Sequence, residues 1–352
     1  MTKNDCKIED PVLLIDAFNW STRAFYAAWP GWEKPGGEPT DDRAIVSFAW
    51  ALTNIIGKFK PSVTYFCVDA GRPAVRKNIL PCYKAHRKSN PYLKPHRMMC
   101  TELVRRYLPV RIIKIDGYEA DDTMARIAEY LHEKEEKIII ATRDRDLVQV
   151  RQHLQCNNVF VYDAEKDKKG LNNGLLEPSR EDVPENVWKA IVGDSSDNIP
   201  SITGAVTANK IIDSGTLEEW LDGGLAKRKL EDEKNKELYE QVRELEKEPC
   251  RRDIFNRNLK ITSLLGEHCV VPPLCRSYVD IETNKFDFDG LVRALETFKA
   301  VEEPEYAFQE EDGGGVAKQK RVYTPNYGNF NSIWSEMEMR DHFSRSYSPI
   351  NL

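Results

Sequence analysis

Four short apolar runs in the first half of the chain each lead into acidic residues. The runs are residues 12–15, 63–68, 111–115 and 138–141, and branched apolar side chains are frequent in them. Runs of this length and composition are typical of β-strands that are buried on both faces. The hydrophobic pattern therefore predicts four core strands.

Helical patterns lie between these runs. Residues 44–59 form a long apolar-rich segment, and Met124, Ile127 and Leu131 lie on one face of a second predicted helix. Strands that alternate with helices favour a mostly parallel sheet with helices on both sides. The predicted fold class is therefore α/β, and in such sheets the functional crevice lies at the carboxyl ends of the strands.

Acidic residues gather at this predicted edge. They are Asp16, Asp69, Glu119, Asp121, Asp122, Asp144 and Asp146. A single Asp after a strand is usually a turn former or a helix N-cap, but four such positions converging on one edge indicate a site. Carboxylates packed together acquire raised pKa values unless cations neutralise them. Oxygen ligands without Cys or His favour Mg²⁺ or Mn²⁺.

Charge is segregated along the chain. The net charge of the 352 residues is −6, yet residues 70–101 contain eight Lys or Arg and no Asp or Glu. Tyr83 and Tyr92 lie among these basic residues, and aromatic rings interleaved with positive charge are typical of nucleic-acid binding. The alternative is a solvent-exposed basic loop without a partner.

Several classes of protein are disfavoured. The eight cysteines include no C-x-x-C pair and the six histidines show no zinc-binding spacing, so reduced thiols and no zinc site are expected. No apolar run approaches the roughly 18–20 residues that cross a bilayer, and the N-terminus lacks the apolar region of a signal peptide. A cytoplasmic protein without a membrane partner is expected.

The chain divides into three predicted regions. Residues 1–180 form the α/β core, with a basic segment at about 72–100. Residues 181–300 form a helical subdomain that follows a polar connector. It contains two acids in a turn, Asp194 and Asp197, and a charged helical run at 225–248. The turn at Gly204 and the helix after it fit a helix–hairpin–helix unit, whose backbone N–H groups bind phosphate. Residues 301–352 form an acidic, glycine-containing linker and a tail, for which a replication protein is the expected partner.

Five segments carry a resemblance to a known family. In order, over roughly residues 12–265, they are LLIDAFN, YFCVDAGRPAVRKNILPCYKAHR, GYEADD, IATRDRDLVQV and VGDSSDNIP. The chain resembles the 5′-nuclease family: bacteriophage 5′→3′ exonucleases, the N-terminal nuclease domain of bacterial DNA polymerase I and, more distantly, flap endonucleases. The resemblance implies a PIN-like core in which the basic segment is a helical arch over the active site.

The resemblance also implies roles for individual residues. The metal ligands would be Asp16, Asp69, Glu119, Asp121, Asp122, Asp144, Asp146, Asp194 and Asp197, which would hold two Mg²⁺ ions, with Mn²⁺ able to substitute. The catalytic residues would be Lys84, Arg87, Asp69 and Asp144. The DNA-binding residues would be Arg72, Arg76, Lys77, Tyr83, Lys84, Arg87, Lys88, Gly204 and Thr207, with the Tyr83 ring stacking on a terminal base.

The hairpin departs from the family pattern. The usual form is G-V-P-G-I-G-x-K-T-A, whereas residues 201–208 read SITGAVTA, so the first glycine is missing and Val206 replaces the lysine. The resemblance implies a K⁺ site and a contact with duplex DNA at this hairpin, and the shortened turn departs from the pattern that provides both.

The expected function is a divalent-metal-dependent 5′→3′ exonuclease and 5′-flap endonuclease. Its substrates would be DNA with free 5′ ends, nicks, gaps or flaps, and RNA:DNA primers, and the protein is expected to be a stand-alone monomer, encoded by a phage or another mobile element. Two alternatives remain: a PIN-like ribonuclease, or a non-catalytic structure-specific DNA-binding protein.

Overall fold

The computed structural model describes residues 10–34, 37, 39, 43–70, 74–87, 90–115, 117–222 and 250–271, and the backbone of 279–282. The expected charged helix at 225–248, the tail at 301–352, Arg72 and Lys88 all lie outside the described residues.

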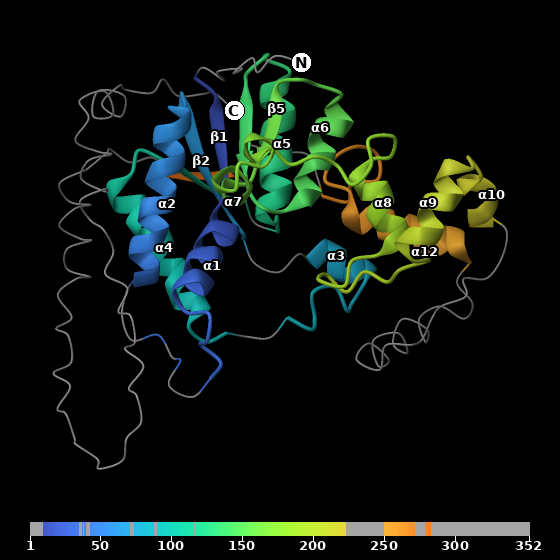
Figure 1. Cartoon of the computed structure of the whole chain (residues 1–352), viewed down its shortest axis with the longest axis horizontal. Coiled ribbons are helices and arrows are strands. Elements are labelled where there is room, and N and C mark those ends of the chain that lie inside the picture. Colours follow the sequence, from blue (N-terminus) through green and yellow to red (C-terminus); the bar gives the residue numbers. More distant parts are fainter. Residues whose placement is uncertain are drawn as a thin grey trace, which may run out of the picture.

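One mixed sheet forms the centre of the protein (Figure 1). Its spatial order is β5-β4-β1-β2-β3-β6. The strands are β1 (Val12–Asp16), β2 (Val63–Val68), β3 (Arg111–Ile115), β4 (Ile138–Ala141), β5 (Val159–Tyr162) and β6 (Val279–Glu282). The first five pair in parallel and β6 runs antiparallel to β3. The predicted α/β class and the four predicted strands are confirmed.

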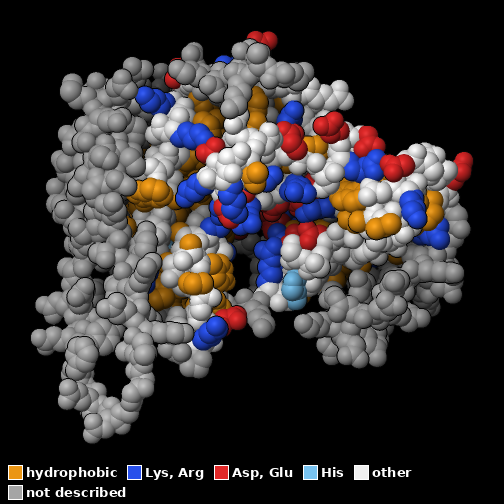
Figure 2. All heavy atoms as spheres, in the orientation of Figure 1, with side chains coloured by type: hydrophobic (Ala, Val, Ile, Leu, Met, Phe, Trp, Pro, Cys, Tyr) orange, Lys and Arg blue, Asp and Glu red, His pale blue; other side chains and the backbone are white. Residues whose placement is uncertain are grey.

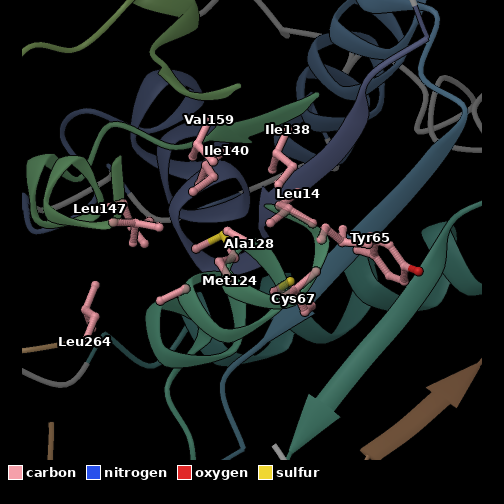
Figure 3. Packing of buried hydrophobic residues seen from close by; sticks show 14 of the residues in the cluster. Leu14, Tyr65, Cys67, Met124, Ala128, Ile138, Ile140, Leu147, Val159 and Leu264 are labelled. Atoms are coloured by element: carbon pink, nitrogen blue, oxygen red, sulfur yellow. The ribbon is translucent and has the colours of Figure 1, made fainter. Parts of the chain in front are cut away.

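Helices cover both faces of the sheet, which is why the strands are apolar throughout. On one face Leu13 and Ile15 pack with α1 (Ala17–Ala28), α2 (Arg43–Phe59) and α4 (Leu93–Tyr107). On the other face Leu14 and Tyr65 pack with α5 (Ala120–His132) and α6 (Val148–Leu154), and Figure 3 shows Leu14, Tyr65 and Met124 in this layer. Alternate residues of β1 therefore belong to opposite cores.

A second, smaller core lies among four helices beside the sheet. These are α8 (Glu185–Val192), α9 (Ala205–Asp213), α10 (Leu217–Asp222) and α12 (Arg251–Thr262). Ala190, Ile191, Ala208 and Ile254 are buried between them. Short elements complete the described chain: α3 (Ala74–Ile79), α7 (Ala164–Lys168), and the 3₁₀ turns η1 (Arg145–Leu147) and η2 (Asn172–Gly174).

The chain returns to the first core after α12, within the range 181–300 that was predicted as the helical subdomain. Leu264 and Leu265 are buried with the α5 layer, and β6 joins the edge of the sheet (Figure 3). The reason is physical: apolar residues after α12 gain more by packing on the sheet than by remaining exposed.

Two expectations about composition can be compared with the described residues. None of the described helices is long and apolar enough to cross a membrane. The six described cysteines carry free thiols.

Arg76 fastens the two cores together from α3. Its side chain is 3% exposed. Nη1 and Nη2 donate to Asp122 Oδ2 and Oδ1 at 2.7 and 2.6 Å, and Nε donates to the Ile261 carbonyl at 2.9 Å. A third acceptor is Glu119 Oε2, 2.9 Å from Nη1. Arg76 thus joins α3 to α5 of the sheet layer and to α12 of the helical core.

Replacement of Arg76 by Met should strongly destabilise the fold. Removing one partner of a buried ion pair leaves an uncompensated charge, here that of Asp122, and costs about 3–5 kcal/mol. Urea denaturation measures this loss. Lys77→Met is the matched control on the same helix: Lys77 is half-buried and has no ion-pair partner within the described structure, so a change within about 0.5 kcal/mol is expected. Equal midpoints for the two variants would contradict the role of Arg76.

Candidate active site

Acids at the carboxyl edge of the sheet accept hydrogen bonds from the backbone at the starts of helices or turns. Asp16 ends β1 and accepts a hydrogen bond from the Asn19 N–H at 2.9 Å as N-cap of α1. Asp144 follows β4 and accepts from the Asp146 N–H at 2.9 Å as N-cap of η1. Asp69, after β2, accepts from the Ala120 N–H at the start of α5 at 2.6 Å. Capping alone therefore explains why each residue type occurs, but not why they meet.

Electrostatic coupling brings the acids together as one cluster. Burial, with the nearby charges of Asp69 and Asp144, raises the pKa of Asp16 to about 7. Burial also raises the pKa of Asp121 well above its ordinary value, with Asp144 and Asp16 adding to the effect. The pKa of Asp69 is raised by burial and by Glu119. Four separate strand ends thus contribute to one shared negative field, as the pattern of the sequence predicted.

The inner and outer acids of the cluster differ in their partners. Asp16, Asp69, Asp121 and Asp144, which we call the inner acids, form no ion pair with the described Lys and Arg residues. The remaining acids do: Glu119 pairs with Arg76 and Lys84, Asp122 with Arg76, Asp146 and Asp194 with Lys189, and Asp197 with Arg87 and Lys84. Basic side chains neutralise the rim of the cluster, while its centre stays negative.

Glu119 and Asp122 open α5 as a reciprocal capping box. The Asp122 carboxylate accepts from the Glu119 N–H at 3.1 Å, and the Glu119 side chain accepts from the backbone of Asp122. Asp122 is 1% exposed and both of its oxygens face Arg76. In this structure both oxygens of Asp122, which was predicted as a metal ligand, accept from Arg76. Arg76, which was predicted to bind DNA, donates to groups within the protein.

Lys84 projects into the cluster from a tight turn after α3. Its ammonium lies 2.6 Å from Glu119 Oε1 and 3.6 Å from Asp197 Oδ2. Burial opposes the charge, but Tyr83, Glu119 and Asp197 together raise the pKa of Lys84. Its backbone is left-handed, with φ +56°, a conformation that costs a non-glycine residue about 1–3 kcal/mol. Surrounding contacts therefore hold this lysine in place.

The loop that contains Asp197 supplies those contacts. The Lys84 N–H donates to the Asp197 carbonyl at 3.0 Å, and Asn198 Nδ2 donates to the Cys82 carbonyl at 2.9 Å. The loop itself requires Gly193, whose φ is +73° and whose missing Cβ would lie 2.6 Å from the Ile199 carbonyl oxygen. Two motifs more than a hundred residues apart in the chain therefore form one structural unit.

The position of Tyr83 corrects a further prediction. Its ring was expected to stack on a terminal base, but it is 3% exposed and packs with Leu80 and Ile199. Its hydroxyl donates to Glu119 Oε2 at 3.1 Å. Burial, with the charge of Glu119, raises the pKa of Tyr83, so the phenol stays protonated. Tyr83 is a core residue that orients Glu119.

Arg87 extends the cluster to the surface. Its side chain is 56% exposed, and Nη2 donates to Asp197 Oδ1 at 2.5 Å. Lys77 is half-buried on α3. Of the predicted DNA-binding residues in the described part of the basic segment, Lys77, Lys84 and Arg87 keep a polar group at or near the surface.

Lys189 is a site residue that the sequence analysis missed. Its ammonium contacts Asp146 Oδ1 and lies 2.7 Å from Asp194 Oδ2. Burial and the charge of Asp144 raise the pKa of Asp146 to about 7. Burial acts in the same direction on Asp194, but Lys189 and Ser196 together lower the pKa of that carboxyl. The sequence signal that could have identified Lys189 is its position on α8, five residues before Asp194.

Gly204 and Thr207 lie apart from the acids, at the beginning of α9. Gly204 is the N-cap of this helix without a side-chain cap, and Thr207 is exposed. Val206, which stands where the family pattern has a lysine, is 73% exposed. This first turn presents backbone N–H groups at the surface.

The described residues contain no preformed cage of three or more His, Cys, Asp or Glu side chains that holds a metal ion directly. Nine acids were expected to be metal ligands. Seven of them interact electrostatically with one another, Asp197 adjoins them through Lys84, which it shares with Glu119, and Asp122 is held by Arg76. Figure 2 shows basic side chains beside acidic ones near the centre of the face in view.

Comparison with known proteins agrees with this site. Residues 11–178 match the family described as 5′-3′ exonuclease, N-terminal resolvase-like domain. A 5′-3′ exonuclease of Aquifex aeolicus is 29% identical over 196 residues, which are 54% of this chain and 64% of that protein. The thermostable DNA polymerase I of Thermus thermophilus is 30% identical over 225 residues, which are 60% of this chain and 25% of that protein. This chain thus matches less than two thirds of the length of either relative.

Among solved structures, a bacteriophage T5 flap endonuclease in a pseudo-enzyme–product complex with DNA and metal ions is similar. It is 19% identical, with a TM-score of 0.46, over 72% of this chain and 89% of that chain. The family match covers β1 to β5 and most of the acid cluster. Residues 11–178 are therefore similar to the 5′-3′ exonuclease, N-terminal resolvase-like domain family, in agreement with the order of the sequence motifs.

Proposed function

We propose that this protein is a divalent-cation-dependent 5′→3′ nuclease that hydrolyses phosphodiester bonds in DNA with free 5′ ends, nicks, gaps or flaps. One observation carries the proposal: the four inner acids, from separate strand ends, share one buried negative field with the Lys84 ammonium beside it. An acid cluster repels a polyanionic substrate such as DNA, even with Lys84 beside it. The site therefore suits such a substrate only if further cations bind to the acids.

The donor chemistry fits Mg²⁺, with Mn²⁺ able to substitute. The inner acids offer carboxylate oxygens, and hard divalent ions take such ligands. The raised pKa values of Asp16, Asp69 and Asp121 reflect burial and the repulsion of neighbouring carboxylates, both of which a bound cation offsets. Two bound ions would supply an activated water and neutralise charge on the phosphate. We assign the ligands to the eight cluster acids and leave out Asp122.

The basic side chains at the rim would act on the phosphate. Lys84 is held beside the inner acids, and Arg87 lies farther out on the same turn. Both are paired with carboxylates in the present structure, namely Glu119 and Asp197. Contact with a phosphate would therefore replace one anionic partner by another. This exchange keeps the charge of each cation balanced.

Duplex DNA would contact the start of α9. The backbone N–H groups after Gly204 and the hydroxyl of Thr207 are exposed there, and a helix N-terminus suits a phosphate. Lys77 would add a further backbone contact. A K⁺ ion at this hairpin, RNA:DNA primers as substrates and action as a monomer are further parts of the proposal that follow from the motif pattern alone.

A PIN-like ribonuclease is the second candidate. The parallel sheet with acids at its carboxyl edge is common to both proposals. The ordered Lys84 turn and its docking on the Asp194–Asp197 loop favour the 5′-nuclease, because they place a fixed cation beside the acids. Cleavage of matched RNA and DNA flaps separates the two candidates.

Cleavage of a 5′-labelled DNA flap should require Mg²⁺ and Asp144. Wild-type protein is expected to cut with MgCl₂ and not with EDTA, and Asp144→Ala should lose cleavage while still binding the flap. The reason is that Asp144 shares its field with Asp16 and Asp121 at the centre of the cluster. Gel assays measure cutting, and fluorescence anisotropy measures binding. Normal cutting by Asp144→Ala would exclude its assignment, and metal-independent cutting would exclude the mechanism.

Lys84→Ala should slow the single-turnover rate by roughly 10²–10³-fold, the usual cost of losing one preorganised charge-stabilising donor. Lys77→Ala is the control within the same basic segment and should mainly weaken binding, most strongly at low salt. Melting temperatures of both variants separate a rate effect from loss of the folded state. A single-turnover rate for folded Lys84→Ala within threefold of wild type would remove this residue from the catalytic set.

The metal-free protein should lose stability as pH rises from about 4 to about 7. Folding raises the pKa of Asp16 and Asp146 to about 7, whereas an unfolded Asp titrates near about 3.9. The folded state therefore binds more protons in this window, so its stability falls until pH exceeds the folded pKa. Melting temperatures measured in EDTA across this pH range, for wild type and for Asp16→Asn, give the contribution of Asp16. If the melting temperature changes with pH equally in both proteins, Asp16 does not contribute.

Added MgCl₂ should raise the melting temperature more at pH 8 than at pH 5.5. Cation binding needs ionised carboxylates, and protons compete for them at the lower pH. Stabilisation follows because the ion binds the folded state only. The same Asp16→Asn variant is the control and should gain less at pH 8. Equal stabilisation at both pH values would argue against ligands with raised pKa.

A further inference from the structure

Arg97 lies on the side of the acid cluster formed by α1 and α4. Its Nε and Nη2 donate to Thr22 Oγ1 at 3.1 and 2.8 Å. The guanidinium carbon lies 4.5 Å from the centre of the Phe18 ring. A hydroxyl from α1 and an aromatic face thus fix the plane of the guanidinium on a half-buried side chain.

Arg97 is close enough to the inner acids to interact with them electrostatically. Asp69 and Asp16 both act on its charge, and Asp69 is influenced by Lys84 as well. Asp69 is therefore flanked by two cations that come from different elements: Lys84 from the turn after α3, and Arg97 from α4. The sequence analysis counted Arg97 in the basic segment but assigned it no role.

The partners of Arg97 differ from those of the other cations at the site. Arg76, Lys84, Arg87 and Lys189 each form ion pairs with rim acids. Within the described chain Arg97 forms none, and its Nη1 donates no hydrogen bond. Burial lowers the pKa of Arg97 although Asp69 and Asp16 act to raise it. A partly buried arginine with a neutral hydroxyl partner retains both its charge and donor capacity.

We propose that Arg97 binds a phosphate of the substrate strand on the α1–α4 side of the inner acids. This inference rests on the proposed nuclease function and adds a second anchor for the strand. A guanidinium suits a phosphate because its planar donors match two phosphate oxygens. Thr22 and Phe18 hold the plane, so little side-chain freedom is lost when the phosphate binds.

Single methylphosphonate substitutions identify the contact. Each substituted 5′-flap substrate lacks the charge of one phosphate near the cleavage site. Arg97→Ala should reduce kcat/KM on the unmodified flap about 10- to 100-fold, as expected for a lost hydrogen-bonded charge pair. At one position, the methylphosphonate should lower the kcat/KM of wild type to a similar extent and leave the kcat/KM of Arg97→Ala almost unchanged. Arg97→Lys should recover only part of the loss, because it lacks the planar fork.

Arg106→Ala is the matched control. Arg106 lies on the same helix, is 63% exposed and pairs with Glu102, so its loss should leave kcat/KM within twofold of wild type at every substrate. Thr22→Val removes the hydroxyl that orients Arg97 and should produce a smaller decrease than Arg97→Ala at the same phosphate position. Among these variants, only Arg97→Ala should have a smaller slope of log binding constant against log salt concentration. The decrease should be about one, which corresponds to one phosphate contact.

The outcomes separate this inference from the function on which it rests. If wild type cleaves with Mg²⁺ but Arg97→Ala responds to every methylphosphonate as wild type does, Arg97 contacts no phosphate and only fastens α4 to α1. A lower melting temperature without any position-specific effect leads to the same conclusion. If wild type fails to cleave, the nuclease proposal is wrong, and anisotropy with the same substrates in EDTA still decides whether Arg97 recognises one phosphate.

Discussion

Buried negative charge at the carboxyl edge of the sheet is the constraint that organises the rest of this structure. The fold places acids from four strand ends close together, and burial together with mutual repulsion raises the pKa of Asp16, Asp69 and Asp121. Basic residues from other segments neutralise the rim of the cluster. Arg76, Lys84 and Lys189 achieve this from α3, the following turn and α8. The helical core is therefore connected to the sheet through charges as well as apolar contacts.

The local capping role of the acids is compatible with the proposed functional one. Asp16, Glu119 and Asp144 cap helices or turns, as most acids after strands do. A helix N-terminus stabilises nearby negative charge by about 0.3–1 kcal/mol for each exposed acid, and more where the group is partly buried. Capping therefore reduces the cost of crowding the carboxylates. The same βα connections that a parallel sheet needs also supply the site with its acids.

The features that the sequence could predict are those encoded by local pattern. Apolar runs located β1 to β4, and the rule that parallel strands end at one edge brought Asp16, Asp69 and Asp144 together. The partners of the basic residues could not be predicted in this way. Arg76 and Arg97 belong to the same basic segment, yet one is buried against Asp122 and the other rests on Phe18. Such differences arise from contacts between elements that are distant in the chain, as does the return of the chain to β6.

The Lys84 turn links charge balance to substrate recognition. Its left-handed backbone is held by the Asp197 loop, and its ammonium is shared between Glu119 and Asp197. A lysine so confined cannot search for a phosphate by large movements, so the substrate must reach it. In the proposed nuclease, a substrate phosphate would replace Glu119 as the partner of the Lys84 ammonium. Metal binding and phosphate binding would then favour each other if the metal ion took Glu119 as a ligand.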